Sequence, residues 1–172
     1  MIIKVVDYNQ NWSSDYQKEE HFIRAILQEE LVKSFHIGST SVPGLKAKPI
    51  IDILLVVNDI YKLDSFSKQF QEIGYEVMGE FGITGRRYFR KGGNLRTHQI
   101  HAYQYDKIEE IERHLAFRDY LREHPVVCKQ YGELKSQLAK EYPNDIKGYG
   151  DGKDKFVKSV EKDALKWFWA VR

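Results

Sequence analysis

The stretch 36-HIGSTSVPGLKAKPIIDILLVV-57 decides the fold of this chain. An apolar strand ends in Gly-Ser-Thr, a loop with one glycine and two prolines follows, and a second apolar run occupies residues 50 to 57. That second run contains a single ionisable residue, Asp52. A strand, a loop rich in hydrogen-bonding groups and a strand with one carboxylate together indicate a functional site.

Asp52 needs a positively charged partner. Burying an ionised carboxylate in so apolar a run costs several kcal/mol unless a cation or a metal ion compensates it. The loop offers Lys46 and Lys48, and Gly38 to Ser41 offer backbone N–H groups and hydroxyls to an anion such as phosphate. We therefore expect a phosphate-binding loop. The alternative is a structural salt bridge between Asp52 and a loop lysine.

Five segments of the chain resemble one known family, the GrpB-like proteins of the polymerase-beta-type nucleotidyltransferase superfamily. The densest match is the segment quoted above, up to Ile53. The other segments are 85-GRRYFRK-91, 96-RTHQIHAY-103, 117-FRDYLR-122 and 153-KDKFV-157.

This resemblance implies an α+β fold, in which helices flank a mixed β-sheet and the C-terminal part is helical. It also implies that Gly38, Ser39 and Thr40 bind nucleotide phosphates and that Asp52 holds Mg²⁺ or Mn²⁺. Superfamily enzymes carry a second carboxylate two residues away, whereas this chain has Ile50 and Leu54 at those positions. Transfer by two metal ions about 3.5–4 Å apart needs shared carboxylates, so the carboxylate set is incomplete.

Two histidines lie in the segment where the superfamily places a further carboxylate. Neutral imidazole binds metals and acts as a general base near neutral pH, so His98 and His101 are candidate catalytic residues. Residues three apart in a strand face opposite sides of the sheet. At most one of the two histidines is therefore expected to face Asp52, and a hydrogen-bonded structural role is the alternative for each.

Two further basic positions complete the candidate site. The segment 86-RRYFRKGGNLR-96 has five basic residues and no acidic one, which is typical of a hairpin that binds polyanions or of a sheet edge protected by charge. Arg87 is the phosphate-binding candidate there. Lys153, and with it Lys155, follows a glycine-rich approach to the final helix; the alternative is an ordinary loop capped by Asp151.

Length and composition predict one domain, spanning residues 1–172, with a sheet-rich part (1–105) and a helical part (106–172). The 42% apolar content suffices for one core, and the 27 basic and 25 acidic residues nearly balance. Such a balance does not favour nucleic acid as a partner. The single cysteine and the absence of an apolar run of about 20 residues predict a cytoplasmic protein without a membrane partner. The sequence does not predict the oligomeric state.

The pattern of apolar residues and of Gly and Pro predicts the following elements. Helices are expected at 12–30, 63–73, 107–123, 125–142 and 153–169, and strands at 33–37, 50–57, 75–81, 87–91 and 97–104.

Two functions are consistent with these residues. The first is a nucleotidyltransferase that transfers a nucleotidyl group to a small acceptor, with Asp52 on the metal and a histidine as base. The second is a non-catalytic module that binds a nucleotide, a coenzyme-A-type ligand or another phosphorylated small molecule and has a degenerate metal site. Metal dependence of binding distinguishes them.

Overall fold

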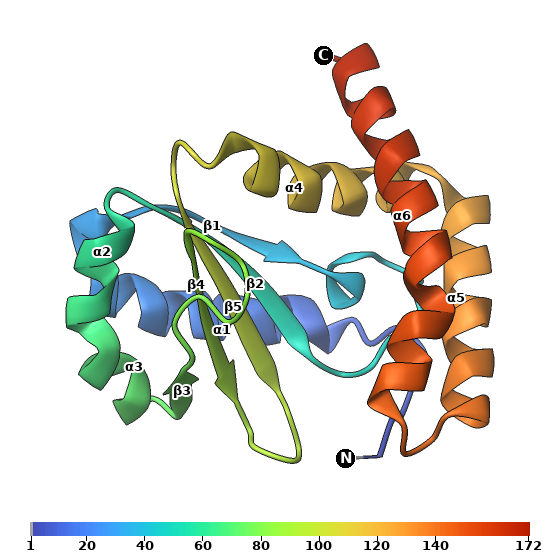
Figure 1. Ribbon diagram of the computed structural model, residues 1–172, viewed down its shortest axis with the longest axis horizontal. Helices are drawn as coiled ribbons and strands as arrows, with labels where there is room; N and C mark the ends of the chain where they lie inside the picture. Colours follow the sequence, from blue (N-terminus) through green and yellow to red (C-terminus); the bar gives the residue numbers. More distant parts are fainter. Residues whose placement is uncertain (1) are drawn as a thin grey trace.

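The computed structural model describes residues 2–172 as one mixed sheet with helices around it (Figure 1). The strands are β1 (Leu31–Ile37), β2 (Ile51–Val57), β3 (Tyr75–Val77), β4 (Arg86–Lys91) and β5 (His98–Gln104). The helices are α1 (Asn11–Leu27), α2 (Ile60–Leu63), α3 (Ser67–Glu72), α4 (Ile108–Glu123), α5 (Pro125–Glu141) and α6 (Ile146–Ala170). Three 3₁₀ turns, η1 (Gln28–Glu30), η2 (Ser39–Ser41) and η3 (Asp64–Phe66), join them. Within residues 2–172, no helix is both long and apolar enough to cross a bilayer.

The sheet has the order β1-β2-β5-β4-β3. β2 and β5 run parallel, and every other neighbouring pair is antiparallel. A mixed sheet followed by three helices confirms the predicted α+β class with a helical C-terminal part.

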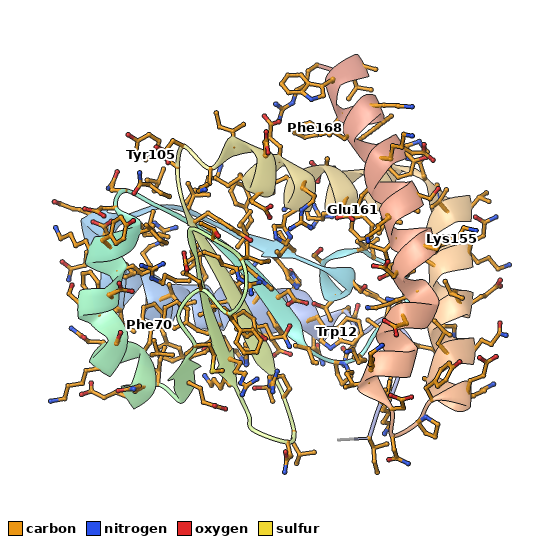
Figure 2. The ribbon with its side chains drawn as sticks, in the orientation of Figure 1. Trp12, Phe70, Tyr105, Lys155, Glu161 and Phe168 are labelled. Atoms are coloured by element: carbon orange, nitrogen blue, oxygen red, sulfur yellow. The ribbon has the colours of Figure 1, made fainter. Side chains whose placement is uncertain are left out.

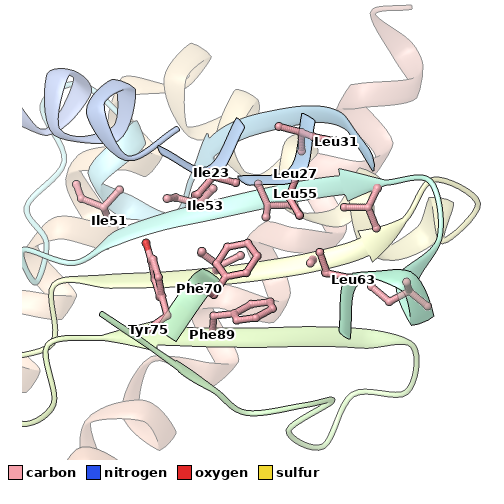
Figure 3. Packing of buried hydrophobic residues seen from close by; sticks show 14 of the residues in the cluster. Ile23, Leu27, Leu31, Ile51, Ile53, Leu55, Leu63, Phe70, Tyr75 and Phe89 are labelled. Atoms are coloured by element: carbon pink, nitrogen blue, oxygen red, sulfur yellow. The ribbon is translucent and has the colours of Figure 1, made fainter. Parts of the chain in front are cut away.

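Strand β2 is buried on both faces because helices cover the sheet on both sides. Ile51, Ile53, Leu55 and Val57 face one side and pack with α1 and with Phe70 of α3 (Figure 3). The next residues in alternation, Asp52 and Leu54, face the other side, where Leu54 packs with partly buried residues of α4. The helical part of the chain therefore covers the face of the sheet that contains Asp52.

The five predicted strands are all present, whereas the structure has six α-helices over residues 2–172 where five were predicted, and several bounds differ. The helix predicted at 63–73 begins earlier, at Ile60, because the Asp59 side chain accepts hydrogen bonds from the N–H groups of Tyr61 and Lys62. It is also interrupted by η3 before α3 continues. The strand predicted at 75–81 ends at Val77.

The final helix differs most from the prediction, because α6 begins at Ile146 rather than Lys153. Asp145, not Asp151, is its N-cap and accepts a hydrogen bond from the N–H of Gly148 at 2.9 Å. The glycines of this segment lie within the helix instead of forming a loop, and one of them, Gly152, permits close packing. A Cβ on Gly152 would lie 2.4 Å from Cδ2 of Leu138 on α5, so only glycine lets the two helices approach here.

Candidate functional site

The loop between β1 and β2 is held by its own buried side chains. It passes through the short turn η2, in which Thr40 is 2% exposed. The Thr40 hydroxyl donates to the carbonyl of Ile50 at 3.2 Å and lies 2.9 Å from Nε2 of His36. Burial lowers the pKa of His36 to about 4, so this imidazole is neutral at pH 7. The side chain of Thr40, a predicted phosphate ligand, is thus buried and forms hydrogen bonds that stabilise the loop.

Helix α4 fixes the same loop from the other side. The Arg122 guanidinium donates to the carbonyl of Ser41 at 3.0 and 2.8 Å, and Arg118 donates to the carbonyl of His36 at 3.2 Å. Hydrogen bonds from charged donors are stronger than those between neutral groups. The loop is therefore attached to the helical part as well as to the sheet.

Gly38 lies directly against Asp52. Its φ is +73°, a value that L side chains rarely adopt, and a Cβ built on it would lie 2.7 Å from Asp52 Oδ2. Contacts this short between a Cβ and a carboxylate do not occur without displacement of one of them. The glycine thus allows the loop backbone to approach the carboxylate, as the sequence predicted for a shared site.

The other oxygen of Asp52 is held by residues of β5. Asp52 is paired in register with Gln99, and Leu54 with His101, so both β5 side chains share the face of Asp52. The Gln99 amide, oriented as its neighbours require, donates to Oδ1 at 3.0 Å. Nε2 of His101 lies 3.1 Å from the same oxygen. These contacts orient the carboxylate.

The two predicted histidines lie on opposite faces, as the alternation required. His98 is on the far face, where its Nδ1 lies 2.8 Å from Thr97 Oγ1 and its Nε2 is 3.8 Å from the buried Glu19. The structure therefore does not bring His98 to Asp52. His101 does reach Asp52, but its second nitrogen, Nδ1, is buried and has no hydrogen-bond partner among the described residues.

A cavity of about 150 Å³ lies beside Asp52. It is lined by Ser39, Lys48, Ile50, Asp52, Gln99, Lys135, Tyr149 and Lys153. Three of these residues are lysines, from the loop, from α5 and from α6, and one is a carboxylate. The cavity is therefore cationic.

Lys135 is the most deeply buried of the three lysines, at 2% exposure. Its ammonium nitrogen lies 2.7 Å from Oγ of Ser39 and 4.4 Å from the ring centre of Tyr131. The nitrogens of Lys48 and Lys153 each lie 5.2 Å from the ring centre of Tyr149. The three side chains thus converge from different elements and pack on two tyrosine rings.

All three lysines lose part of their basicity here. Burial lowers the pKa of Lys48, and Asp52 opposes this effect only in part. Burial, and next the charge of Lys48, lower the pKa of Lys153 to about 8. Burial, and next Lys153, hold the pKa of Lys135 well below its ordinary range. One carboxylate does not compensate one buried and two partly buried ammonium groups, so a second anion would stabilise them.

Tyr149 adds a polar group to the lining. The side chain is 1% exposed, and its hydroxyl has no hydrogen-bond partner among residues 2–172. Burial raises its pKa to about 12, so the hydroxyl keeps its proton and can act as a donor. Buried polar groups are ordinarily paired, and an unpaired one beside a cationic cavity indicates a ligand site.

Two basic candidates lie away from this cavity. Arg87 pairs with Asp64, at 2.7 Å from Nε to Oδ1, and its guanidinium lies over the ring of Tyr61. In register it faces Ala102, on the opposite side of the sheet from His101. Lys155, labelled in Figure 2, is exposed on α6. The structure therefore does not bring Arg87 or Lys155 to the cavity, whereas Lys153 does line it.

The sequence reasoning missed Lys135, Tyr149 and Gln99. A signal for Lys135 was present, because Cys128, Tyr131, Lys135 and Leu138 recur at helical spacing and form the buried stripe of α5. A lysine is unusual on a buried stripe, so its presence there indicates a specific structural or functional role. Gln99 and Tyr149 carry no comparable signal in the sequence.

The donor set around Asp52 does not fit a two-metal centre. Within residues 2–172, no three His, Cys, Asp or Glu side chains gather closely enough to hold a metal ion. The nearest charged neighbours in the cavity are lysines, which repel a divalent cation. The expected Mg²⁺ or Mn²⁺ stays a prediction.

Comparison with solved structures identifies the fold. The crystal structure of the conserved protein GrpB from Enterococcus faecalis superposes with a TM-score of 0.94 at 51% identity, covering 96% of this chain and 99% of that one. A Cid1 poly(U) polymerase bound to MgATP superposes with a TM-score of 0.50 at 11% identity, covering 86% of this chain and 50% of that one. At 11% identity this second likeness concerns the nucleotidyltransferase fold alone.

Comparison with curated proteins gives the same family. The UPF0157 protein YqkA of Bacillus subtilis is 44% identical over 165 residues, which are 96% of this chain and 48% of that protein. The chain thus spans about half of YqkA. The glutamate-rich protein GrpB of Alkalihalophilus pseudofirmus is 34% identical over 161 residues, 91% of this chain and 92% of that one. The model of the family described as GrpB protein matches residues 2–163, and this chain therefore belongs to the GrpB family.

Proposed function

We propose that this protein binds a nucleotide, and that the cavity beside Asp52 holds the nucleotide's phosphates. The observation that carries the proposal is the convergence of Lys48, Lys135 and Lys153 on one small cavity with a single carboxylate. A phosphate accepts hydrogen bonds from several ammonium groups and compensates their charge. Ser39, which also lines the cavity, contributes a hydroxyl at the start of η2.

The proposal explains a costly arrangement. Without an anion, the protein brings one buried lysine and two partly buried lysines together, and the lowered pKa values of these lysines reflect that cost. Residues whose pKa is perturbed by burial and by each other in a cavity are typical of functional sites. A purely structural role needs only one lysine to pair with Asp52.

Binding without transfer is the form of the function that the geometry supports best. The position two residues before Asp52 is Ile50 and the position two residues after is Leu54, so no second carboxylate shares a metal from this strand. His101 contacts Asp52 through one nitrogen, and the other nitrogen is buried. A histidine so placed positions Asp52 rather than taking a proton from an acceptor in the cavity.

Nucleotidyl transfer to a small acceptor is the second candidate. The observation that favours it is Asp52 itself, which β2 places directly against Gly38 of the loop, with Oδ1 oriented by two residues of β5. This arrangement would suit one metal ion bound jointly with the phosphates. The two candidates predict opposite effects of removing the charge of Asp52.

The test is isothermal titration of the intact protein with ATP, in EDTA and in Mg²⁺, on the wild type and on Asp52→Asn. For a binding module we expect ATP to bind in EDTA and Asp52→Asn to tighten it, because a negative charge near the phosphates is removed. For a transferase, binding requires Mg²⁺ and Asp52→Asn abolishes it.

Lys135→Met separates a binding role of this lysine from a structural one. Replacing a poorly compensated buried ammonium by an apolar side chain of similar length should raise the melting temperature. The same change should weaken ATP binding, since one phosphate donor is lost. Lys155→Met, on the exposed side of α6, is the matched control and should change neither quantity. Failure of wild type to bind ATP in either condition would refute the proposed function.

A further inference from the structure

A second, larger cavity adjoins the cationic one. Its volume is about 440 Å³, and it shares Lys48 and Ile50 with the cavity beside Asp52. The remaining lining residues come from the N-terminal segment (Ile2 and Lys4), from the loop before β2 (Pro49) and from the turn between β4 and β5 (Asn94, Leu95, Arg96 and Thr97). A molecule that places its phosphates beside Asp52 can therefore extend into this space, which we name the hairpin groove.

The groove is apolar at its outer part. Leu95 is 84% exposed and Ile2 is 75% exposed, and both side chains line the groove. Pro49 and Ile50 continue the apolar lining toward the cationic cavity. Two exposed aliphatic side chains beside a cavity form a surface that gains free energy when a ligand covers it.

The charges of the groove suit an anion with an uncharged end. Lys48 and Arg96 lie where the groove meets the cationic cavity, since Lys48 lines both spaces and Arg96 donates to Gln99, a lining residue of the cavity. Among the described residues that line the groove, none is acidic. Lys48 and Arg96 therefore place positive charge toward the phosphates, and Lys4 adds a further cation on the N-terminal segment that also contributes Ile2.

We propose that the hairpin groove binds the nucleoside part of the nucleotide, with the base against Leu95 and Ile2. This inference rests on the proposed function and names the subsite that the phosphate cavity alone does not supply. A cavity of about 150 Å³ is smaller than the roughly 300–1,000 Å³ typical of ligand pockets, whereas the two adjoining spaces together fall in that range.

The test compares ATP with inorganic triphosphate, which has the phosphates without the nucleoside. Both are titrated into wild type, Leu95→Ala and Leu165→Ala, in a chain tagged only at its C-terminus, so that Ile2 is not covered. Leu165 is an aliphatic residue of α6, 41% exposed and outside the groove, which makes it the matched control. Both leucines are exposed, so neither change should impair folding.

Wild type should bind ATP more tightly than triphosphate. Leu95→Ala should weaken ATP binding roughly fivefold to tenfold, because part of the area of a leucine side chain is no longer covered, and should leave triphosphate binding unchanged. Leu165→Ala should change neither. Saturation transfer from the labelled methyl groups of Leu95 to the adenine protons of bound ATP would show the contact directly.

The outcomes separate the two proposals. If Leu95→Ala weakens ATP and triphosphate equally, or weakens neither, the groove does not hold the nucleoside, while the phosphate site stands. If wild type binds triphosphate and ATP with the same affinity, the inference is likewise wrong. If it binds neither ligand, the proposed function itself fails.

Discussion

Replacing Gly38 by alanine tests the contact on which the candidate site is built. The backbone of Gly38 has φ +73° and ψ −174°, a region occupied almost only by glycine, and holding another residue there costs about 1–3 kcal/mol. The new Cβ would also lie 2.7 Å from Asp52 Oδ2 and 3.0 Å from Asp52 Cβ. Overpacking of this kind costs about 1–3 kcal/mol more. We therefore expect Gly38→Ala to reduce the free energy of unfolding by about 2–6 kcal/mol.

Gly44→Ala separates the two contributions. Gly44 also has a positive φ, +85°, but a Cβ there would meet nothing within 4 Å. Gly44→Ala should therefore reduce the free energy of unfolding only by the backbone strain, about 1–2 kcal/mol. Urea denaturation followed by circular dichroism measures both variants, and an unchanged slope with urea shows that the difference is one of stability.

The double variant Gly38→Ala with Asp52→Ala completes the cycle. Removing the Asp52 carboxyl group removes the closest overlapping atom, so the double variant should be more stable than the sum of the single effects by about 1–2 kcal/mol. Equal costs for the two glycine variants, together with simple additivity in the cycle, would refute the close approach of the loop to Asp52.

Three further predictions concern charge and burial. Because the pKa of Lys153 is lowered to about 8, the unfolded chain binds more protons than the folded one between pH 8 and 10.5. The free energy of unfolding, measured by urea denaturation, should therefore rise across this window by up to about 3 kcal/mol, and Lys153→Met should flatten the rise. The pKa of His36 is lowered to about 4, so the free energy of unfolding should fall by up to about 3 kcal/mol as pH drops from 6.5 to 4. His36→Gln should reduce this pH dependence, whereas His21→Gln, at an exposed position, should not. Tyr75→Phe removes the hydroxyl that donates to the buried Glu19 at 2.7 Å, and thermal denaturation should show a loss of about 1–3 kcal/mol; no loss would mean that Lys91, 2.8 Å from Glu19, compensates the carboxylate alone.

Local patterns predicted much of the fold. The apolar run around Asp52 and the alternation of β5 depend only on neighbours in sequence, and they correctly separated His98 from His101. The bounds of α6 could not be predicted in this way. Its glycines indicate a loop by local propensity, whereas in the structure they lie within a helix, and one of them, Gly152, packs against Leu138 of α5.

The sequence by itself determined the β1–loop–β2 unit, the family and the presence of a carboxylate that needs cations. Its order of residues placed Gly38, Ser39 and Lys48 near Asp52, because a short connection joins the two strands. Only the tertiary structure decided which distant groups complete the cavity. Lys135 and Lys153 arrive from α5 and α6, and Arg87 is turned to the opposite face, because helix packing and strand register, unlike local pattern, depend on the whole chain.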